Sequence, residues 1–165
     1  MSDLILAVDP GTTASGAVIY DYATHSVQRI WPEVGNDELL DFIDHCAMPA
    51  SMAIEMIASY GMAVGASVFE TCVWIGRFTQ AFGAENTTKV YRKDVKMHLC
   101  GTTAAKDPNV RRALMDLFSA TGGGVRPEIG TRAKPGPLYG MSKHAWPALG
   151  VALTYCANME VTEVE

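Results

Sequence analysis

Apolar and polar positions along the chain divide it into short segments with two different periods. Residues 4–8 form an uninterrupted apolar run, and residues 14–22 form a second run beyond a Gly-Thr-Thr turn at residues 11–13. Apolar runs of this length, bounded by turn residues, predict buried strands that are here joined as a hairpin. A third strand is expected around residues 27–31, so the first part of the chain predicts an antiparallel meander.

Helical and strand periods alternate in the rest of the chain. Apolar residues at helical spacing predict a helix that is capped by Asn36 or Asp37 and ends near Cys46. Residues 52–57 and 88–91 predict the fourth and fifth strands. The other expected parts are a glycine-bearing loop over residues 58–65, a helix over 67–82, a connecting segment over 92–100, a short helix begun at Asp107-Pro108, and a last helix ending near Asn158.

This order of elements predicts an α/β fold, in which a mixed five-stranded sheet carries helices on both faces. A length of 165 residues with 48% hydrophobic composition suits one core, so we expect a single domain over residues 1–165. Residues 121–139 are rich in glycine and proline and predict a flexible loop, because long loops in compact domains are commonly functional or disordered. Residues 159–165 form an acidic tail.

The composition favours an intracellular protein. No stretch approaches the roughly 18 uninterrupted apolar residues of a membrane span, and the first residues lack the basic and apolar parts of a signal peptide. We therefore expect a cytoplasmic location without membrane contact. The four cysteines are widely spaced and are expected to be buried reduced thiols rather than zinc ligands; they are Cys46, Cys72, Cys100 and Cys156.

Two acidic residues stand in strongly apolar segments. Asp9 ends the first apolar run, and Glu55 lies within residues 52–57. An ionised carboxylate is costly to remove from water, so a chain that places one on each of two buried strands is expected to use them for a metal ion or a proton. The alternative for Asp9 is a structural role as a cap of the turn that follows it.

Basic residues are concentrated in two stretches, although the chain as a whole is acidic. The net charge of −5 argues mildly against nucleic acid as a partner, because DNA phosphates require local Lys and Arg. The two stretches are nevertheless candidates for phosphate contact, and scattered solvated charge is the alternative. They contain Arg92, Lys93, Lys96, Lys106, Arg111 and Arg112 in the first, and Arg126, Arg132, Lys134 and Lys143 in the second.

Several short motifs in a fixed order resemble one nuclease family. They are Asp9-Pro10-Gly11-Thr12-Thr13, Ala53-Ile54-Glu55, Tyr91-Arg92-Lys93-Asp94-Val95-Lys96, Cys100-Gly101, Ala105-Lys106 and Val110. Their order and spacing over nearly the whole chain resemble RuvC-type Holliday junction resolvases, especially those of phages. The resemblance implies a ribonuclease H-like fold, with Asp9 and Glu55 on neighbouring central strands.

The resemblance also implies a chemistry and a partner. It implies phosphodiester cleavage with two Mg²⁺ ions, which Mn²⁺ can replace, because carboxylate oxygens suit these hard cations. By resemblance, Asp9 bridges both ions and Glu55 binds one of them. The implied partner is branched DNA, above all the four-way junction. The implied assembly is a homodimer, because two symmetric nicks require two active sites.

The start of the last helix departs from the family pattern. The family usually has an acid or His there and an Asp three residues later, and this chain has His144 followed by Pro147. We expect His144 to be a metal ligand or a general base, neutral because it lies near a helix N-terminus, and the alternative is an ordinary histidine at a helix start. Ser142 is a good cap, but Pro147 would then lie past the first turn, so the regular helix is expected to start later or to be kinked.

Other residues complete the candidate site. Glu70 and Asp107 are the acids that can replace the missing Asp, and their alternatives are a solvent-facing position and a helix cap. Lys106 matches a functionally placed lysine of the family and can neutralise the scissile phosphate. Tyr60 can stack on an unpaired base or simply pack within its loop. The further candidate DNA contacts are Lys96, Arg111, Arg132 and Lys134.

Two other functions stay open beside a magnesium-dependent, structure-selective DNA endonuclease. The Asp9 turn also resembles the first phosphate-binding turn of actin- or hexokinase-like phosphotransferases, but those folds need two lobes and this length has room for one. A noncatalytic module that binds branched DNA is suggested by Pro147, whereas Asp9 and Glu55 argue for catalysis. Junction resolution is therefore the favoured function.

Overall fold

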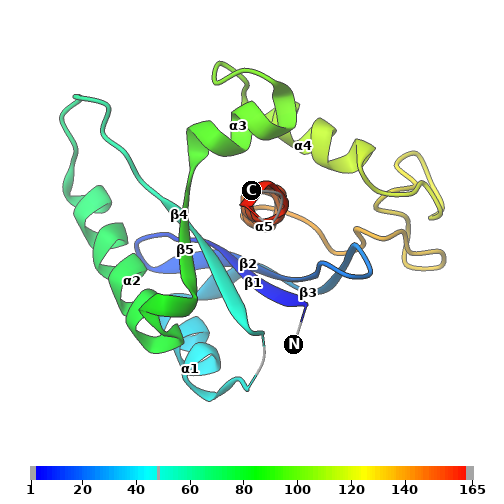
Figure 1. The fold of residues 1–165 in the computed structure, drawn as a ribbon. Helices are drawn as coiled ribbons and strands as arrows, with labels where there is room; N and C mark the ends of the chain where they lie inside the picture. Colours follow the sequence, from blue (N-terminus) through cyan, green and yellow to red (C-terminus); the bar gives the residue numbers. More distant parts are fainter. Residues whose placement is uncertain (1–2, 48, 163–165) are drawn as a thin grey trace.

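Five strands form one mixed sheet in the computed structural model, which describes residues 3–47 and 49–162. The order across the sheet is β3-β2-β1-β4-β5 (Figure 1). Because β1 pairs antiparallel with β2 and parallel with β4, the expected mixed five-stranded sheet is confirmed. The strands are β1 (Leu4–Asp9), β2 (Ala14–Asp21), β3 (Ser26–Gly35), β4 (Ser51–Met56) and β5 (Thr87–Tyr91).

Helices cover both faces of the sheet, as expected. They are α1 (Asn36–His45), α2 (Ala66–Phe82), the short 3-10 helix η1 (Ala84–Asn86), α3 (Arg92–Cys100), α4 (Asp107–Asp116) and α5 (Ala145–Thr162). Helices α1 and α2 lie on one face, and α5 lies on the other with α3 and α4 packed against it (Figure 1). Residues 92–100, for which the sequence predicted no conformation, form α3.

Strand residues alternate between two hydrophobic clusters, one on each face of the sheet. Leu6 belongs to the cluster that α1 and α2 complete, whereas Ala7 and Ala53 belong to the cluster beneath α3, α4 and α5. Successive side chains of a strand point to opposite faces. By this alternation Asp9 and Glu55 both face the side of the sheet that α5 covers.

The edge strand β3 is longer than the sequence predicted and is irregular at Pro32. Its pairing with β2 shifts between Ser15 and Ala17, so that Pro32 and Glu33 both lie opposite Gly16. Proline has no N–H to donate and is tolerated on edge strands and at bulges. This bulge contributes to the functional site described below.

Two expected helix caps are wrong. Helix α1 begins with Asn36, whose buried side-chain amide donates to the Gly11 carbonyl and accepts a hydrogen bond from Ser15 instead of capping the helix. Helix α4 begins with Asp107 and has Lys106 at the cap position, so Asp107 makes no cap hydrogen bond. In both cases the side chain has a tertiary partner, which local sequence does not reveal.

The last helix begins at Ala145, later than a Ser142 cap would place it, so the expected late start is confirmed. Pro147 therefore lies in the first turn. The first four N–H groups of a helix have no partner within the helix, so a proline at this point removes no helical hydrogen bond.

The acidic tail expected over residues 159–165 starts inside α5. The helix continues to Thr162, past the expected end near Asn158, and Glu160 accepts a hydrogen bond of 2.7 Å from the Tyr22 hydroxyl. This contact ties the end of the helix to the end of β2. Residues 163–165 lie outside the described residues.

Residues 121–139, expected to be a flexible loop, fold back on themselves with hydrogen bonds between their own backbone groups. The N–H of Gly122 donates to Pro127 at 2.8 Å, and the N–H of Gly136 donates to Ile129 at 2.9 Å. A Cβ atom on Gly122 or Gly136 would lie 2.7 Å or less from loop backbone atoms. Close backbone packing therefore explains these glycines, and the mobility of the loop stays a prediction.

Two further expectations concern membranes and cysteines. None of the helices in residues 3–47 and 49–162 is both long enough and apolar enough to cross a membrane. All four cysteines are free thiols, but Cys156 alone is buried, and Cys46, Cys72 and Cys100 are partly exposed. The expectation of buried thiols is therefore wrong for these three.

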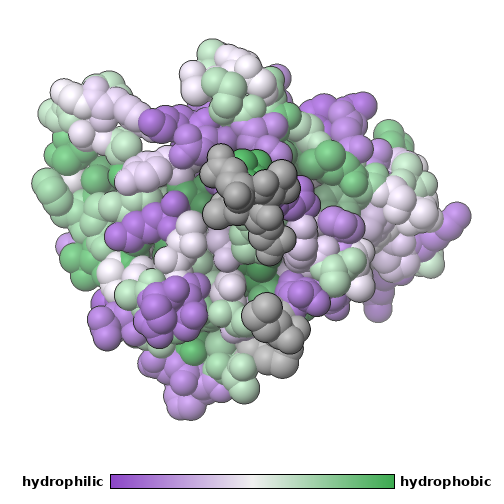
Figure 2. All heavy atoms as spheres, viewed as in Figure 1, coloured by the Kyte–Doolittle hydropathy of each residue, from purple (hydrophilic) through white to green (hydrophobic). Residues whose placement is uncertain are grey.

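Apolar side chains are exposed along α2. Phe69 is 62% exposed and Val73 is 59% exposed. In the space-filling view, hydrophobic residues gather on the flank where α2 lies in Figure 1, whereas hydrophilic residues lie above them toward α3 (Figure 2). Large exposed apolar side chains on one helix are typical of an interaction surface.

Candidate active site

Asp9 and Glu55 lie at the carboxyl ends of two neighbouring parallel strands. Val8 pairs with Ile54 in the ladder between β1 and β4, so Asp9 and Glu55 follow at matching positions. Each of the two side chains is 15% exposed. Neighbouring strands are about 4.8 Å apart, which brings the two carboxylates within reach of one bound ion.

The turn after Asp9 is fixed by a buried polar network. The Ser15 hydroxyl donates to the Asn36 side chain at 2.6 Å and accepts a hydrogen bond from the Gly11 N–H at 3.2 Å. The Asn36 amide donates to the Gly11 carbonyl at 2.9 Å, and Ser15 and Asn36 are each 1% exposed. Because the Ser15 hydroxyl accepts the hydrogen bond from the N–H of the turn, the Asp9 carboxylate is not needed as a cap and is available for chemistry.

His144 meets Asp9 from the loop that leads into α5. Its Nδ1 lies 3.0 Å from Oδ2 of Asp9, and its side chain is 57% exposed. The backbone N–H of His144 donates to the Pro32 carbonyl at the β3 bulge, and the neighbouring Lys143 pairs with Glu33. The bulge of the edge strand thereby holds the residue that precedes α5.

Gly16 makes room for His144 above the sheet. It pairs with Asp9 across the ladder between β1 and β2. A Cβ atom at position 16 would lie 2.3 Å from the carbonyl oxygen of His144 and 2.5 Å from its Cβ atom. Any side chain at this position would therefore push His144 away, which explains a glycine inside a buried strand where it normally weakens the sheet.

Arg92 joins two of the acids. Its Nη1 lies 3.3 Å from Oε2 of Glu55, and its Nη2 pairs with the carboxylate of Asp107 at the start of α4. Tyr91 pairs with Met56 at the end of the ladder between β4 and β5, so Arg92 leaves the sheet beside the end of β4. The Arg92 side chain is 30% exposed and that of Asp107 is 74% exposed.

Burial opposes ionisation of the two central carboxyls. Burial, and then the charge of Asp9, raise the pKa of Glu55 to about 7, although Arg92 opposes the shift. Burial also raises the pKa of Asp9 above its usual value, against the hydrogen bond from His144. Loss of water disfavours the charged form of an acid. Acids with raised pKa values beside an open cavity are typical of functional sites.

The donor types at this site fit a hard divalent cation. Asp9 and Glu55 supply carboxylate oxygens and His144 supplies a ring nitrogen, and a cation would relieve the repulsion between the two buried acids. Across residues 3–47 and 49–162, however, no group of three or more His, Cys, Asp or Glu side chains is arranged to hold an ion. Arg92 supplies the positive charge between Glu55 and Asp107 instead.

Three cavities that share lining residues lie beside the partners of the two acids. The middle cavity is lined by His144, which contacts Asp9, and by Arg92, which contacts Glu55, together with Asp107, Arg111, Lys143 and Pro147, among others. Arg92 lines a second cavity with Tyr60 and Lys96, and Arg111 lines a third with Arg126. Positive charge along these cavities suits an extended anion.

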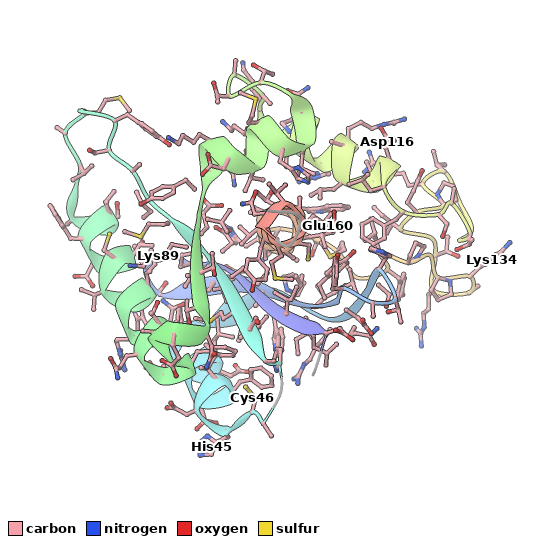
Figure 3. All side chains as sticks on the ribbon, viewed as in Figure 1. His45, Cys46, Lys89, Asp116, Lys134 and Glu160 are labelled. Carbon is pink, nitrogen blue, oxygen red and sulfur yellow. The ribbon has the colours of Figure 1, made fainter. Side chains whose placement is uncertain are left out.

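Some of the other predicted site residues lie in the cluster around Asp9 and Glu55, and others lie elsewhere on the molecule. Asp107 belongs to the cluster, whereas Glu70 is exposed on α2, on the opposite face of the sheet. Lys106 is exposed at the start of α4 and forms no ion pair within the described part of the chain. Arg132 and Lys134 lie on the loop of residues 121–139, from which Lys134 points outward (Figure 3). The roles of all five stay predictions.

Tyr60 lies in a tight turn between β4 and α2. The N–H of Met62 donates to the Ser59 carbonyl at 2.9 Å, and φ is 49° at Tyr60 and 80° at Gly61. Positive φ at both central residues is typical of a type I′ turn and is unfavourable for a residue as large as Tyr. The residue is 61% exposed, so its ring is open to a partner. Base stacking by Tyr60 stays a prediction.

Sequence reasoning missed two arginines at this site. Arg92 was assigned to a basic stretch but not to the acids, although it follows the strand next to that of Glu55. Residues that directly follow adjacent parallel strands lie at the same edge of the sheet, and this was the signal available. Arg126 had no such signal, because the loop that carries it has no periodic pattern.

Two solved structures of RuvC from Thermus thermophilus share this fold. One is 18% identical, with a TM-score of 0.61, and the match covers 95% of this chain and 96% of that chain. The other, RuvC in complex with a Holliday junction substrate, is 20% identical with a TM-score of 0.62 and the same coverage. No protein-family model and no curated protein matches the sequence. The chain therefore has the ribonuclease H-like fold of RuvC-type resolvases.

Proposed function

We propose that this protein is a Mg²⁺-dependent, structure-selective DNA endonuclease that resolves four-way junctions. The observation that carries the proposal is the pair of buried carboxylates, Asp9 and Glu55, at the ends of two parallel strands of this fold. The similar RuvC chain that is in complex with a Holliday junction supports branched DNA as the substrate. The proposed place of action is the cytoplasm of a bacterial or phage-infected cell.

Asp9, Glu55 and His144 are the proposed ligands of two Mg²⁺ ions, which Mn²⁺ is expected to replace. Asp9 would be the central ligand of this set, because it contacts His144 and adjoins Glu55. Bound Mg²⁺ ions supply an activated water and stabilise the leaving oxygen of a phosphodiester. Asp107 is a further candidate oxygen donor when its pair with Arg92 opens.

His144 can also move a proton. An ionised Asp9 only accepts hydrogen bonds, so the 3.0 Å contact requires the proton to be on Nδ1 of His144. When the ring is neutral, the other ring nitrogen, Nε2, carries a lone pair and can take a proton from the attacking water. Metal ligation and general-base catalysis by His144 both require a neutral ring, and the contact with Asp9 fixes the tautomer for either role.

The basic cavities on either side of the acids are the proposed path of the DNA backbone. Lys106 is proposed to act at the scissile phosphate, and Tyr60 is proposed to stack on an unpaired base at the junction. The other proposed phosphate contacts are Lys96, Arg111, Arg132 and Lys134, to which Arg126 is added because it lines a cavity with Arg111.

A homodimer would supply two active sites for two symmetric nicks. The α2 flank is the proposed interface, because Phe69 and Val73 are exposed there (Figure 2). Burial of these two side chains against a partner would remove apolar surface from water. The dimer is therefore expected to dissociate when Phe69 is replaced by a charged residue, which size-exclusion chromatography with light scattering measures.

A noncatalytic module that binds branched DNA is the second candidate function. It is favoured by Pro147, which stands where the family has an Asp, and by Arg92, whose guanidinium pairs with both Glu55 and Asp107. Such a module would bind junctions through the same basic cavities without cleaving them. Among the described residues, nothing comparable favours the phosphotransferase alternative, whose second lobe would need a second sheet.

A cleavage assay separates these functions. Four-way junction, fork and linear duplex of the same sequence are each incubated with the protein in Mg²⁺, in Mn²⁺ and in EDTA. The proposal expects paired nicks in the four-way junction with either metal and none in EDTA. Binding of the junction without cleavage under any condition would support the noncatalytic module and refute the nuclease.

A further inference from the structure

Arg92 carries the positive charge that faces the central acids. One terminal nitrogen lies 3.3 Å from Glu55, and the other pairs with Asp107. Asp9, Glu55 and Asp107 place three carboxyl groups at the end of the sheet, and Arg92 contacts two of them. Arg92 therefore occupies the electrostatic position that a divalent cation would take.

The same guanidinium borders the space that is open to DNA. Arg92 lines both the cavity that contains His144 and the cavity that contains Tyr60, and its side chain is 30% exposed. A guanidinium has five N–H donors in a planar fork, so it can serve two carboxylates or one phosphate equally well. Arg92 can thus exchange one anion for another without leaving the site.

We propose that Arg92 is a resident counter-ion that competes with the divalent cation for Glu55 and is drawn to a DNA phosphate when substrate binds. Cation binding and DNA binding then strengthen each other. A cation on Glu55 frees Arg92 to pair with a phosphate, and a phosphate that holds Arg92 leaves Glu55 free for the cation. This inference rests on the proposed function. It assigns to Arg92 a positioning role, since Arg92 acts by releasing Glu55 and Asp107.

Two features favour this role over a merely structural ion pair. The partner of Arg92 on α4, Asp107, is 74% exposed, and ion pairs at such exposure contribute little to stability. Release of Arg92 also frees Asp107 as an oxygen donor, in a chain that has Pro147 where the family has its last acid. The exchange therefore replaces the ligand that the sequence lacks.

Mn²⁺ binding tests the proposal without any measurement of cleavage. Calorimetric titration with Mn²⁺ is performed on the wild type, on Arg92→Gln and on Arg29→Gln, first without DNA. Arg29→Gln is the matched control, because it removes the same charge from an arginine that stacks on Trp31 and Phe42. Arg92→Gln is expected to bind Mn²⁺ about tenfold or more tightly than the wild type, which corresponds to about 1.4 kcal/mol, and Arg29→Gln is expected to stay within twofold.

The wild type is then titrated with an unmodified four-way junction present, at a low temperature at which cleavage is slow. Its Mn²⁺ affinity is expected to rise toward that of Arg92→Gln, whose own affinity changes less than threefold. Equal Mn²⁺ affinity of wild type and Arg92→Gln without DNA would overturn the role of Arg92 alone. A wild-type Mn²⁺ affinity that does not change when DNA is added would also overturn the proposed role of Arg92. This second measurement uses the wild type, so it does not depend on whether a variant folds. Failure of both proteins to bind Mn²⁺ at all would refute the proposed function as well.

Discussion

At the scale of single residues, the burial of Glu55 makes the stability of the protein depend on pH. The folded pKa is about 7, and the usual value is 4.5. Between these two pH values the folded protein binds a proton that the unfolded chain releases, so stability falls as pH rises through this window and levels off above it. This pKa shift of Glu55 changes the free energy of unfolding by about 3 kcal/mol across the window, since a shift of one pKa unit corresponds to about 1.4 kcal/mol.

Glu55→Gln removes this ionisation and keeps a similar shape. In EDTA we expect the variant to melt several degrees above the wild type at pH 8, because the wild type must then hold a buried charge that the variant lacks. At pH 5 the two melting temperatures are expected to be nearly equal. Thermal unfolding followed by circular dichroism measures both. A difference that stays constant from pH 5 to pH 8 would contradict the assignment of the raised pKa to Glu55.

The glycine at position 16 is predicted to be essential for the place of His144. Gly16→Ala puts a Cβ atom 2.3 Å from the His144 carbonyl oxygen and should displace the ring from Asp9. We expect junction cleavage to fall by about 10²-fold, as for His144→Ala, in the range of a lost general base. The control is Gly35→Ala, because a Cβ atom there has no neighbour within 4 Å. Equal cleavage rates of the two glycine variants would show that this contact does not matter.

At the scale of elements, the sequence predicted the strands well and the tertiary partners of helix starts poorly. The predicted bounds of β1, β2, β4 and β5 agree with the structure within one or two residues. The central strands β1, β2 and β4 are buried apolar runs, which leave a strong signal, whereas β5 is an edge strand in which only Val90 is buried. The roles of Asn36 and Asp107 were missed, since both residue types are common helix caps and their actual partners lie far away in the sequence. The pair of Arg92 with Glu55 likewise depends on strand register, which one sequence does not reveal.

A substitution at the start of α5 can restore the Asp that RuvC-type resolvases have where this chain has Pro147. Pro147 is in the first turn and lines the same cavity as His144 and Asp107. An Asp is well tolerated in the first turn of a helix, so Pro147→Asp should fold and add a carboxylate to the cavity. We expect Pro147→Asp to bind Mn²⁺ several-fold more tightly than Pro147→Asn, which has similar size but no charge. Equal affinities in a calorimetric titration would mean that this position does not face the cation.

Substitutions of basic residues on α4 and on the loop of residues 121–139 are expected to have two different effects. Lys106→Ala is expected to lower the cleavage rate more than junction affinity, whereas Arg132→Ala and Lys134→Ala should mainly weaken binding and reduce its salt dependence by about one counterion each. Arg126→Ala should behave like the second group, and more strongly, because Arg126 lines a cavity next to Arg111. Filter binding across salt concentrations, with single-turnover cleavage, gives both quantities. Identical profiles for all four variants would refute the division into catalytic and positioning residues.

At the scale of the whole molecule, the order of elements predicted the mixed five-stranded sheet, and the resemblance of the motifs to RuvC-type resolvases predicted the fold. Asp9 and Glu55 stand out because an acid in an apolar strand is costly, and the structure brings them to one edge of the sheet with His144. The completion of the site was not predictable, because it depends on a β3 bulge, on Gly16 and on Arg92. None of these has a local sequence pattern that specifies a partner.

The most direct test of the central claim is cleavage of a four-way junction by Asp9→Asn, with junction binding measured on the same preparation. The variant keeps the shape of the side chain and removes the charge that the proposed cations need. We predict no detectable cleavage in Mg²⁺ or Mn²⁺, with binding equal to or tighter than that of the wild type, because less negative charge faces the phosphates. Wild-type cleavage by Asp9→Asn would contradict the account.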